Sequence, residues 1–151
     1  MNKDKSALVK AVEKKKAMSA ADFDVKRLIF PAGKGYEIVR MKTIINIEIN
    51  KNHLTIHRDG LGPVTVLCTM MDLKKLLPDN YFLSVHESYV VGILHVARYI
   101  WKREGAGAVI MSDGREIGVA PLCRDEVIRV LHVDGLFVPA KVVVKGKGEK
   151  E

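Results

Sequence analysis

Apolar and polar residues alternate along most of the chain in short segments. This alternation is typical of strands that bury one face. Val, Ile and Leu supply most of the apolar positions, and β-branched residues favour strands. Turn signals such as Asp59-Gly60 and Asp113-Gly114 separate the segments and are typical of tight hairpins. The expected strands cover residues 27–30, 36–41, 43–49, 53–57, 62–68, 82–91 (as one or two strands), 96–101, 108–111 and 115–119.

Two segments have helical spacing instead. The first begins at Thr69, where Asp72 three residues later completes a capping pattern, and it ends before Pro78. The second covers residues 124–132 and is entered through Pro121. About ten short strands, joined by connections too short for parallel crossovers, predict a mainly β, antiparallel fold with two short helices. The helical side chains expected to face inward are Leu73, Leu76, Leu77, Val127, Ile128 and Leu131.

The pattern divides the chain into three parts. Residues 1–25 are expected to form a basic arm. One interpretation is a solvated helix or an unfolded segment, and the other is an arm that contacts the DNA backbone or a helix that dimerises. Residues 19–24 within it are expected to be a linker or turn. Residues 26–135 form the domain. Residues 136–151 are an apolar coda and a basic tail, and the coda is open to three interpretations: an edge strand, an oligomer contact or an unpaired flap.

Composition narrows the class of protein. The chain has 151 residues, 48% of them hydrophobic, which is enough for one ordinary domain. No apolar run reaches the roughly 18 residues of a membrane helix, and no signal peptide is apparent. Cys68 and Cys123 lack the CxxC spacing, so we expect a reduced, cytoplasmic protein. The net charge of +7 suggests a polyanionic partner, although residues 28–135 hold thirteen Lys/Arg and twelve Asp/Glu.

The candidate catalytic and metal-binding patterns are weak. Gly33-Lys-Gly35 lacks the rest of a phosphate-binding loop. His53 and His57 share one face of a strand about 13 Å apart, too far to hold one metal ion. Cys123 has no histidine near it in sequence to form a nucleophile pair. We therefore expect no catalytic residue, no metal and no cofactor.

A set of short motifs occurs in a characteristic order between residues 27 and 131. The most specific is Phe82-x-x-x-His86-x-Ser88-Tyr89-x-Val91. Together these motifs resemble the LytTR domain, a bacterial DNA-binding domain of many response regulators. The other matching motifs are Ile47-Glu48, Asn52-His53, Asp59-Gly60, the helix from Thr69 to Leu-Leu-Pro78, and the strand from Ile117 to Ala120.

The resemblance implies an elongated fold of about ten strands in three small antiparallel sheets, with short helices. It implies sequence-specific binding of double-stranded DNA, with loops rather than a recognition helix entering two successive major grooves. Base contacts would come from the turn at Asn52-His53, from the position after Val90-Val91, and from residues 121–124. The DNA-binding residues expected on this basis are Lys51, Asn52, His53, His86, Gly92, Lys102, Arg103 and Arg124.

Only about 25 residues precede the domain, so we expect a transcriptional regulator of LytTR type without a receiver domain. Its input would come from a partner, from its expression level or from dimerisation, and a homodimer would bind repeated DNA sites. We expect no membrane association.

Three departures from the family pattern suggest an alternative. Glu87 stands where Lys or Arg is common, Gly92 replaces an Asn, and Pro121-Leu-Cys123 replaces basic residues. An Arg–guanine contact contributes ~1–3 kcal/mol of discrimination, so these losses weaken DNA readout. The alternative is a protein-interaction module on the same scaffold, with the apolar coda contributing to partner binding or self-association.

Overall fold

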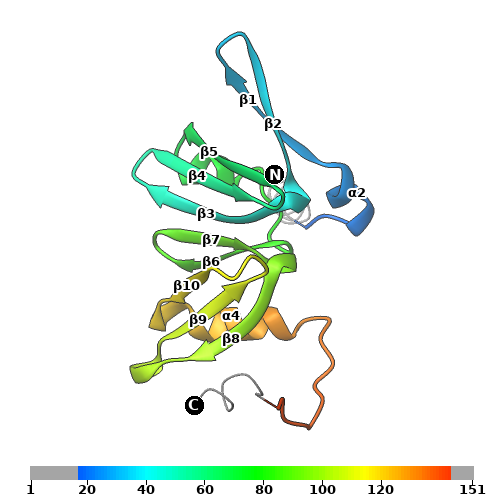
Figure 1. Ribbon diagram of the computed structural model, residues 1–151, viewed down its shortest axis with the longest axis vertical. Coiled ribbons are helices and arrows are strands. Elements are labelled where there is room, and N and C mark those ends of the chain that lie inside the picture. The colour runs from blue at the N-terminus through cyan, green and yellow to red at the C-terminus, as the bar shows by residue number, and fades with distance from the viewer. Residues whose placement is uncertain (1–16, 144–151) are drawn as a thin grey trace, which may run out of the picture.

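A computed structural model describes residues 17–143 of the chain. Ten strands form three antiparallel sheets that are stacked along the long axis of the molecule (Figure 1). This confirms the predicted mainly β fold class. The strands are β1 (Arg27–Ala32), β2 (Gly35–Arg40), β3 (Ile44–Asn50), β4 (His53–Arg58), β5 (Leu61–Leu67), β6 (Phe82–His86), β7 (Tyr89–Gly92), β8 (Val96–Trp101), β9 (Gly107–Met111) and β10 (Glu116–Val119).

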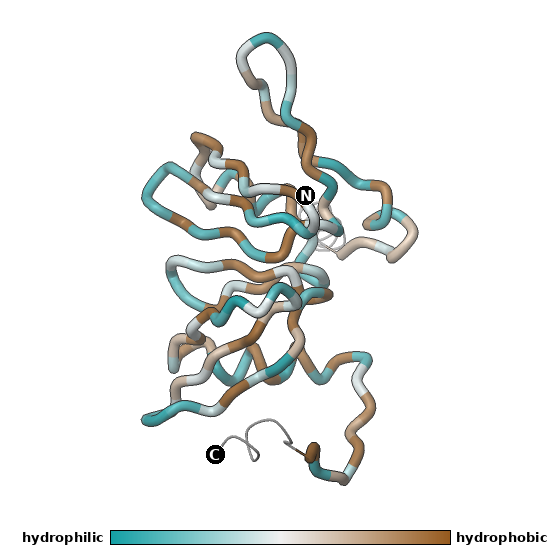
Figure 2. Tube along the Cα trace, in the orientation of Figure 1, coloured by the Kyte–Doolittle hydropathy of each residue, from teal (hydrophilic) through white to brown (hydrophobic). Residues whose placement is uncertain are grey.

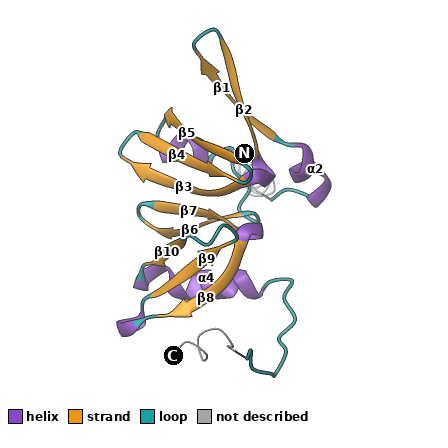
Figure 3. Ribbon diagram, viewed as in Figure 1, coloured by secondary structure: helices purple, strands orange, loops and turns teal. Residues whose placement is uncertain are grey.

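Helices cover the ends and flanks of these sheets (Figure 3). In the described part of the chain the α-helices are α2 (Ala20–Val25), α3 (Met70–Lys74) and α4 (Arg124–His132). Three single 3-10 turns join strands in the described chain, and a fourth joins β10 to α4: η1 (Met41–Thr43), η2 (Ile93–His95), η3 (Arg103–Gly105) and η4 (Pro121–Cys123). Across residues 17–143 no helix has both the length and the apolar character needed to cross a membrane.

The middle sheet has five strands in the order β5-β4-β3-β7-β6. A two-stranded sheet, β1-β2, lies on one side of it, and a three-stranded sheet, β10-β9-β8, lies on the other. The two Asp-Gly turns predicted from the sequence are confirmed, and Gly60 (φ 80°) and Gly114 (φ 89°) take the left-handed conformation that these turns require.

Two hydrophobic cores lie on either side of the middle sheet. The first packs the middle sheet against α2, α3 and the base of the β1–β2 hairpin. The second packs β6 and β7 against the three-stranded sheet and α4. Strand β3 contributes to both, because Ile44 and Ile47 belong to the first core whereas Ile45 belongs to the second. The part of the middle sheet formed by β3, β7 and β6 is therefore packed on both faces, whereas β4 and β5 contribute to the first core only.

The expected linker at residues 19–24 is wrong, because these residues are largely helical. Ser19 caps α2 by accepting a hydrogen bond from the Asp22 amide (3.1 Å). The ring of Phe23 is buried and stacks on Tyr81 with centroids 3.9 Å apart. A domain start at residue 26 would therefore leave out part of the first core. Residues 1–16 of the expected basic arm lie outside the described residues.

Two element boundaries also differ from the prediction. Strand β1 continues through Pro31, because both strands of a two-stranded sheet are edges and an edge accommodates a residue without an N–H. The Thr69 cap is confirmed, but α3 ends at Lys74, and Leu76 is 62% exposed instead of facing inward. Pro78 disfavours the helical conformation at the residue before it, which shortens the helix from its C-terminal end.

The second predicted helix is confirmed as α4, with Val127 fully buried and Ile128 and Leu131 half-buried. Beyond it, residues 135–143 form neither helix nor strand, so the edge-strand interpretation of the coda is wrong for its described part. Residues 144–151 lie outside the described residues.

The close approach of β7 to β3 makes a prediction about stability. A Cβ added at Gly92 would collide with the backbone carbonyl oxygen of Ile44, so the two strands would have to move apart. We expect Gly92→Ala to lower the free energy of unfolding by about 1–3 kcal/mol in urea denaturation. The matched control is Gly118→Ala, where a Cβ meets open space. Equal stabilities of the two variants would contradict the predicted contact.

Candidate nucleic-acid interface

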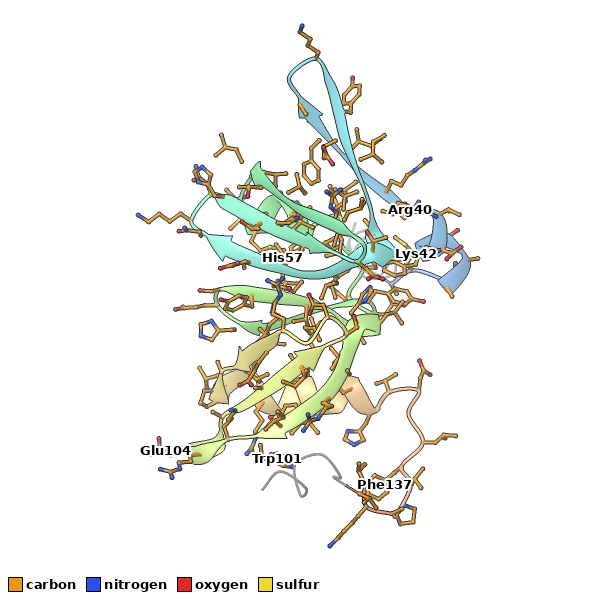
Figure 4. All side chains as sticks on the ribbon, in the orientation of Figure 1. Arg40, Lys42, His57, Trp101, Glu104 and Phe137 are labelled. Atoms are coloured by element: carbon orange, nitrogen blue, oxygen red, sulfur yellow. The ribbon has the colours of Figure 1, made fainter. Side chains whose placement is uncertain are left out.

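Four turns from two different sheets lie along one long side of the molecule (Figure 1). They are the β3–β4 turn (residues 51–52), the β6–β7 turn (residues 87–88), η4 with the adjoining Arg124, and η3. We call this surface the loop edge. Glu104, in η3, lies at its far end (Figure 4).

The β3–β4 turn forms one end of the loop edge. Lys51 has a φ of 59°, which closes the turn and leaves Lys51, Asn52 and His53 exposed to solvent. The amide of Ile49 donates a hydrogen bond to the carbonyl of Ser88 at 2.8 Å. This bond ties the first turn to the β6–β7 turn beside it.

A hollow of about 550 Å³ connects the β6–β7 turn to η4. The backbone of β6 is tied to η4 by a hydrogen bond from the Ala120 amide to the Val85 carbonyl (2.9 Å). His86 accepts a hydrogen bond from the Ser88 amide at Nδ1 (3.0 Å), which sets the orientation of its ring. The lining includes His86, Glu87, Leu122, Cys123 and Lys74 from α3.

Arg124 connects η4 to η3 at the other end of the loop edge. A Cβ placed on Gly105 would lie 3.9 Å from the Arg124 Nη1 atom. The same guanidinium is 3.3 Å from the Asp125 carboxylate, and both groups are accessible to solvent. Tyr99 lies behind this contact. Burial raises the pKa of its hydroxyl, so that group stays protonated at neutral pH.

Cations outnumber acids on the loop edge by a small margin. Lys102 is already 3.1 Å from Glu116, whereas Arg103 is exposed in η3. Exposed ion pairs of this kind exchange readily with other partners, because each contributes less than about 1 kcal/mol. The basic residues on or beside the loop edge are Lys51, Lys74, Lys102, Arg103 and Arg124. The acidic residues there are Glu87, Glu104 and Asp125.

A series of polar side-chain contacts joins the middle sheet to the β9–β10 turn, outside the loop edge. His57 Nε2 lies 3.3 Å from the Glu48 carboxylate and 3.2 Å from the Arg115 guanidinium, and Arg115 also contacts Asp113 at 3.4 Å. One Nε2 atom can donate to Glu48 or accept from Arg115, but not both at once. His57 therefore has a structural role between the sheets (Figure 4). Among residues 17–143 no cluster of three or more His, Cys, Asp or Glu could hold a metal ion.

The structure brings most of the residues expected to bind DNA to one surface. Seven of the eight lie on or beside the loop edge: Lys51, Asn52, His53, His86, Lys102, Arg103 and Arg124. Gly92 does not. It is buried at the end of β7 against Ile44, where no side chain could reach DNA, so its expected role in base contact does not fit the structure.

Sequence reasoning missed Lys74. It belongs to a five-residue helix that is distant in sequence from η4, and only the tertiary fold turns it toward the hollow. Cys123 and His86 also line that hollow, but the described structure records no hydrogen bond between them.

Comparisons of the sequence and of the fold with known proteins agree on one family. The chain is 30% identical over 98 residues to the CO-responsive transcriptional regulator RcoM of Rhodospirillum rubrum, covering 65% of this chain and 40% of that protein. It is 28% identical over 107 residues to the sensory transduction protein LytT of Bacillus subtilis, covering 71% of this chain and 44% of that protein. The chain thus spans less than half the length of either relative.

The fold comparison agrees. A solved LytTr DNA-binding domain from Bacillus cereus superposes with a TM-score of 0.61 at 16% identity, covering 70% of this chain and 95% of that one. The family model described as LytTr DNA-binding domain matches residues 34–131. Because that match covers more than half of the chain, this protein belongs to the family of LytTr DNA-binding domains.

Proposed function

We propose that this chain binds double-stranded DNA sequence-specifically through the loop edge and acts as a cytoplasmic regulator of transcription. The observation that carries the proposal is the alignment of four turns from two sheets along one side of a domain of this family. The names of the two relatives, a transcriptional regulator and a sensory transduction protein, support the regulatory part of the proposal.

The two ends of the loop edge suit different base contacts. At one end Asn52 is exposed in a two-residue turn, and its amide matches the paired donor and acceptor of adenine in the major groove. At the other end Arg124 is the basic residue at the start of α4, and a guanidinium matches the two acceptors of guanine. In this proposal Lys51, Lys74 and Arg103 contact phosphates, which orient the protein without reading sequence.

Leu122 suggests a third kind of contact. Its side chain is 98% exposed on η4, next to Arg124. An apolar side chain in the major groove can contact the methyl group of thymine. We infer that Leu122 reads a thymine next to the base contacted by Arg124.

A protein-interaction module is the second candidate. Leu122 is available to it as well, because its exposed side chain could pack against a protein partner instead of a thymine methyl group. Glu87 favours it too, since an exposed carboxylate beside the hollow repels phosphates. The two candidates differ in whether DNA binding depends on the loop edge.

Selection of bound sequences from a pool of random duplexes tests the specificity of the full chain. We expect enrichment of a short motif, and we expect Arg124→Gln to relax the preference at one position by about 1–3 kcal/mol. Enrichment that is indifferent to Arg124 and Asn52 would count against readout by the loop edge. A pool with no enrichment at all would favour the interaction module.

The salt dependence of binding tests the phosphate contacts. We expect Lys51→Asn to weaken binding of the full chain to all duplexes equally and to reduce the slope of log K against log salt by about 1, because one counterion fewer is released. Asn accepts the left-handed conformation of residue 51, so the turn is kept. Fluorescence anisotropy with labelled duplexes measures both quantities.

The control for that series is Arg129→Gln, which removes one charge from the end of α4 that points away from the loop edge. It should leave the slope unchanged. If both variants lose the same slope, DNA attraction is a property of the net charge, and the proposed surface is wrong.

Glu87 gives a prediction in the opposite direction. Glu87→Lys should strengthen binding to any duplex and make the salt slope steeper, because it replaces a repulsive charge on the loop edge with an attractive one. Asp79→Lys makes the same change in charge at an exposed position away from these turns and should have a smaller effect. An equal gain in the two variants would argue against contact between the β6–β7 turn and DNA.

A further inference from the structure

A groove of about 390 Å³ lies between β8 and α4. Its walls are mainly apolar and include Val96, Tyr99 and Trp101 from the strand and Ile128 and Leu131 from the helix. Trp101 is 66% exposed, which is a large apolar area to leave in water. Strand β8 is also the last strand of its sheet in the described chain, so the groove runs beside a row of backbone groups with no strand partner.

A matching apolar segment leaves the end of α4. Residues 136–143, which we call the apolar segment, carry one charged side chain, Lys141, in an otherwise apolar stretch (Figure 2). Figure 1 shows this segment running clear of the domain, and Figure 4 shows Phe137 away from the body of the protein. The exposed fractions are 93% for Leu136, 83% for Phe137, 67% for Val138, 87% for Val142 and 77% for Val143.

We propose that the apolar segment of one copy docks in the β8–α4 groove of a second copy, so that two copies exchange their segments and form a closed dimer. Both halves of the interaction are present on one chain: a groove lined by aliphatic and aromatic side chains, and a segment of aliphatic and aromatic side chains that are exposed within residues 17–143. Burial of one aromatic side chain alone removes roughly 150–250 Å² from water.

The turn after α4 favours a second copy over the chain's own groove. His132 lines the groove, and the segment begins only four residues later. Between them Asp134 takes a φ of 63° and the Gly135 amide donates to the His132 carbonyl at 3.0 Å. This turn directs the chain away from α4. The apolar segment could reach the groove of its own copy only if the turn changed its conformation.

Exchange between two copies lets the segment occupy a groove while the turn after α4 keeps its conformation. A two-fold arrangement uses the groove and the segment of each copy once, which doubles the buried area and leaves no open end for further growth. Pro139 is compatible with docking beside β8, because a segment added at a sheet edge needs N–H groups on one side only. The proposal does not depend on DNA binding. Helix α4 runs from the loop edge to the side from which the segment leaves, and the Trp101 end of the groove adjoins η3.

The first test measures the mass of the full chain by light scattering and sedimentation over a wide range of protein concentration. We expect a dimer, and we expect its dissociation constant to rise at least about tenfold in the segment variant Leu136→Ser/Val138→Ser and in the groove variant Trp101→Ser. The control is Leu67→Ser, which removes a side chain that is 73% exposed on β5, outside the groove. It should remain as dimeric as the original protein.

Mixing the two variants distinguishes exchange from other kinds of association. The segment variant keeps an intact groove and the groove variant keeps an intact segment, so a heterodimer retains one intact contact whereas the homodimer of either variant retains none. An equal mixture should therefore dimerise more tightly than either variant alone and less tightly than the original protein. Trp101 is the single tryptophan of the chain, and its emission should shift to the blue with concentration in the original protein but not in the segment variant.

Three results would overturn the proposal. One is a monomer at every concentration, including a monomer whose Trp101 is shielded by its own segment. Another is a dimer that neither variant weakens. The third is a pair of monomeric variants that do not associate when mixed. Since all three concern mass and fluorescence without DNA, they are independent of the outcome of the DNA-binding experiments.

Discussion

Strand β3 is the constraint on which the rest of the structure depends, because it is the central strand of the middle sheet and, like β6 and β7, contributes to both hydrophobic cores. Ile44 and Ile47 pack toward α2 and α3, and Ile45 packs toward the three-stranded sheet. The end of β7 approaches β3 so closely that only glycine fits at position 92. The two outer layers are thereby held on opposite faces of one strand, and a shift of β3 would disturb both.

The loop edge is a consequence of this arrangement. Its turns come from hairpins of the middle sheet and from connections of the three-stranded sheet, so its shape depends on how the two sheets are packed. Backbone hydrogen bonds from Ile49 in β3 to Ser88 in the β6–β7 turn, and from Ala120 before η4 to Val85 in β6, hold neighbouring turns against the adjacent strands. A surface built from short, mutually bonded turns can approach a groove of DNA as a preformed shape, with little entropy lost on binding.

The charge that would attract a polyanion and the groups that would recognise bases lie in different parts of the chain. The net charge of +7 arises mostly outside residues 28–135, which are close to neutral. On the loop edge itself, acids lie among the cations. Long-range attraction to a polyanion would therefore come largely from the basic segments of the chain, while the turns supply shape and a few directional groups. The apolar segment leaves from the other side of the domain, whereas the Trp101 end of the β8–α4 groove adjoins η3 of the loop edge.

Local chemistry alone was enough to predict the hairpins, the Thr69 cap, helix α4 and the fold class. Each depends on residues close together in sequence: Asp-Gly pairs that permit tight turns, a hydroxyl near free amides, and a period of two or of about four in apolar positions. The capping pattern of Ser19 and Asp22 was equally local and would have revealed α2, but the six-residue helix carries too few apolar positions to show a period.

Only the tertiary structure could place Lys74 beside η4, remove Gly92 from the interface and bring Arg124 next to Gly105. These facts depend on how separate sheets pack, and a pattern within one element carries no information about which side of another element it will meet. The sequence by itself therefore determined the elements and most of the chemical groups available for binding. The packing on both faces of β3 decided which of those groups share a surface.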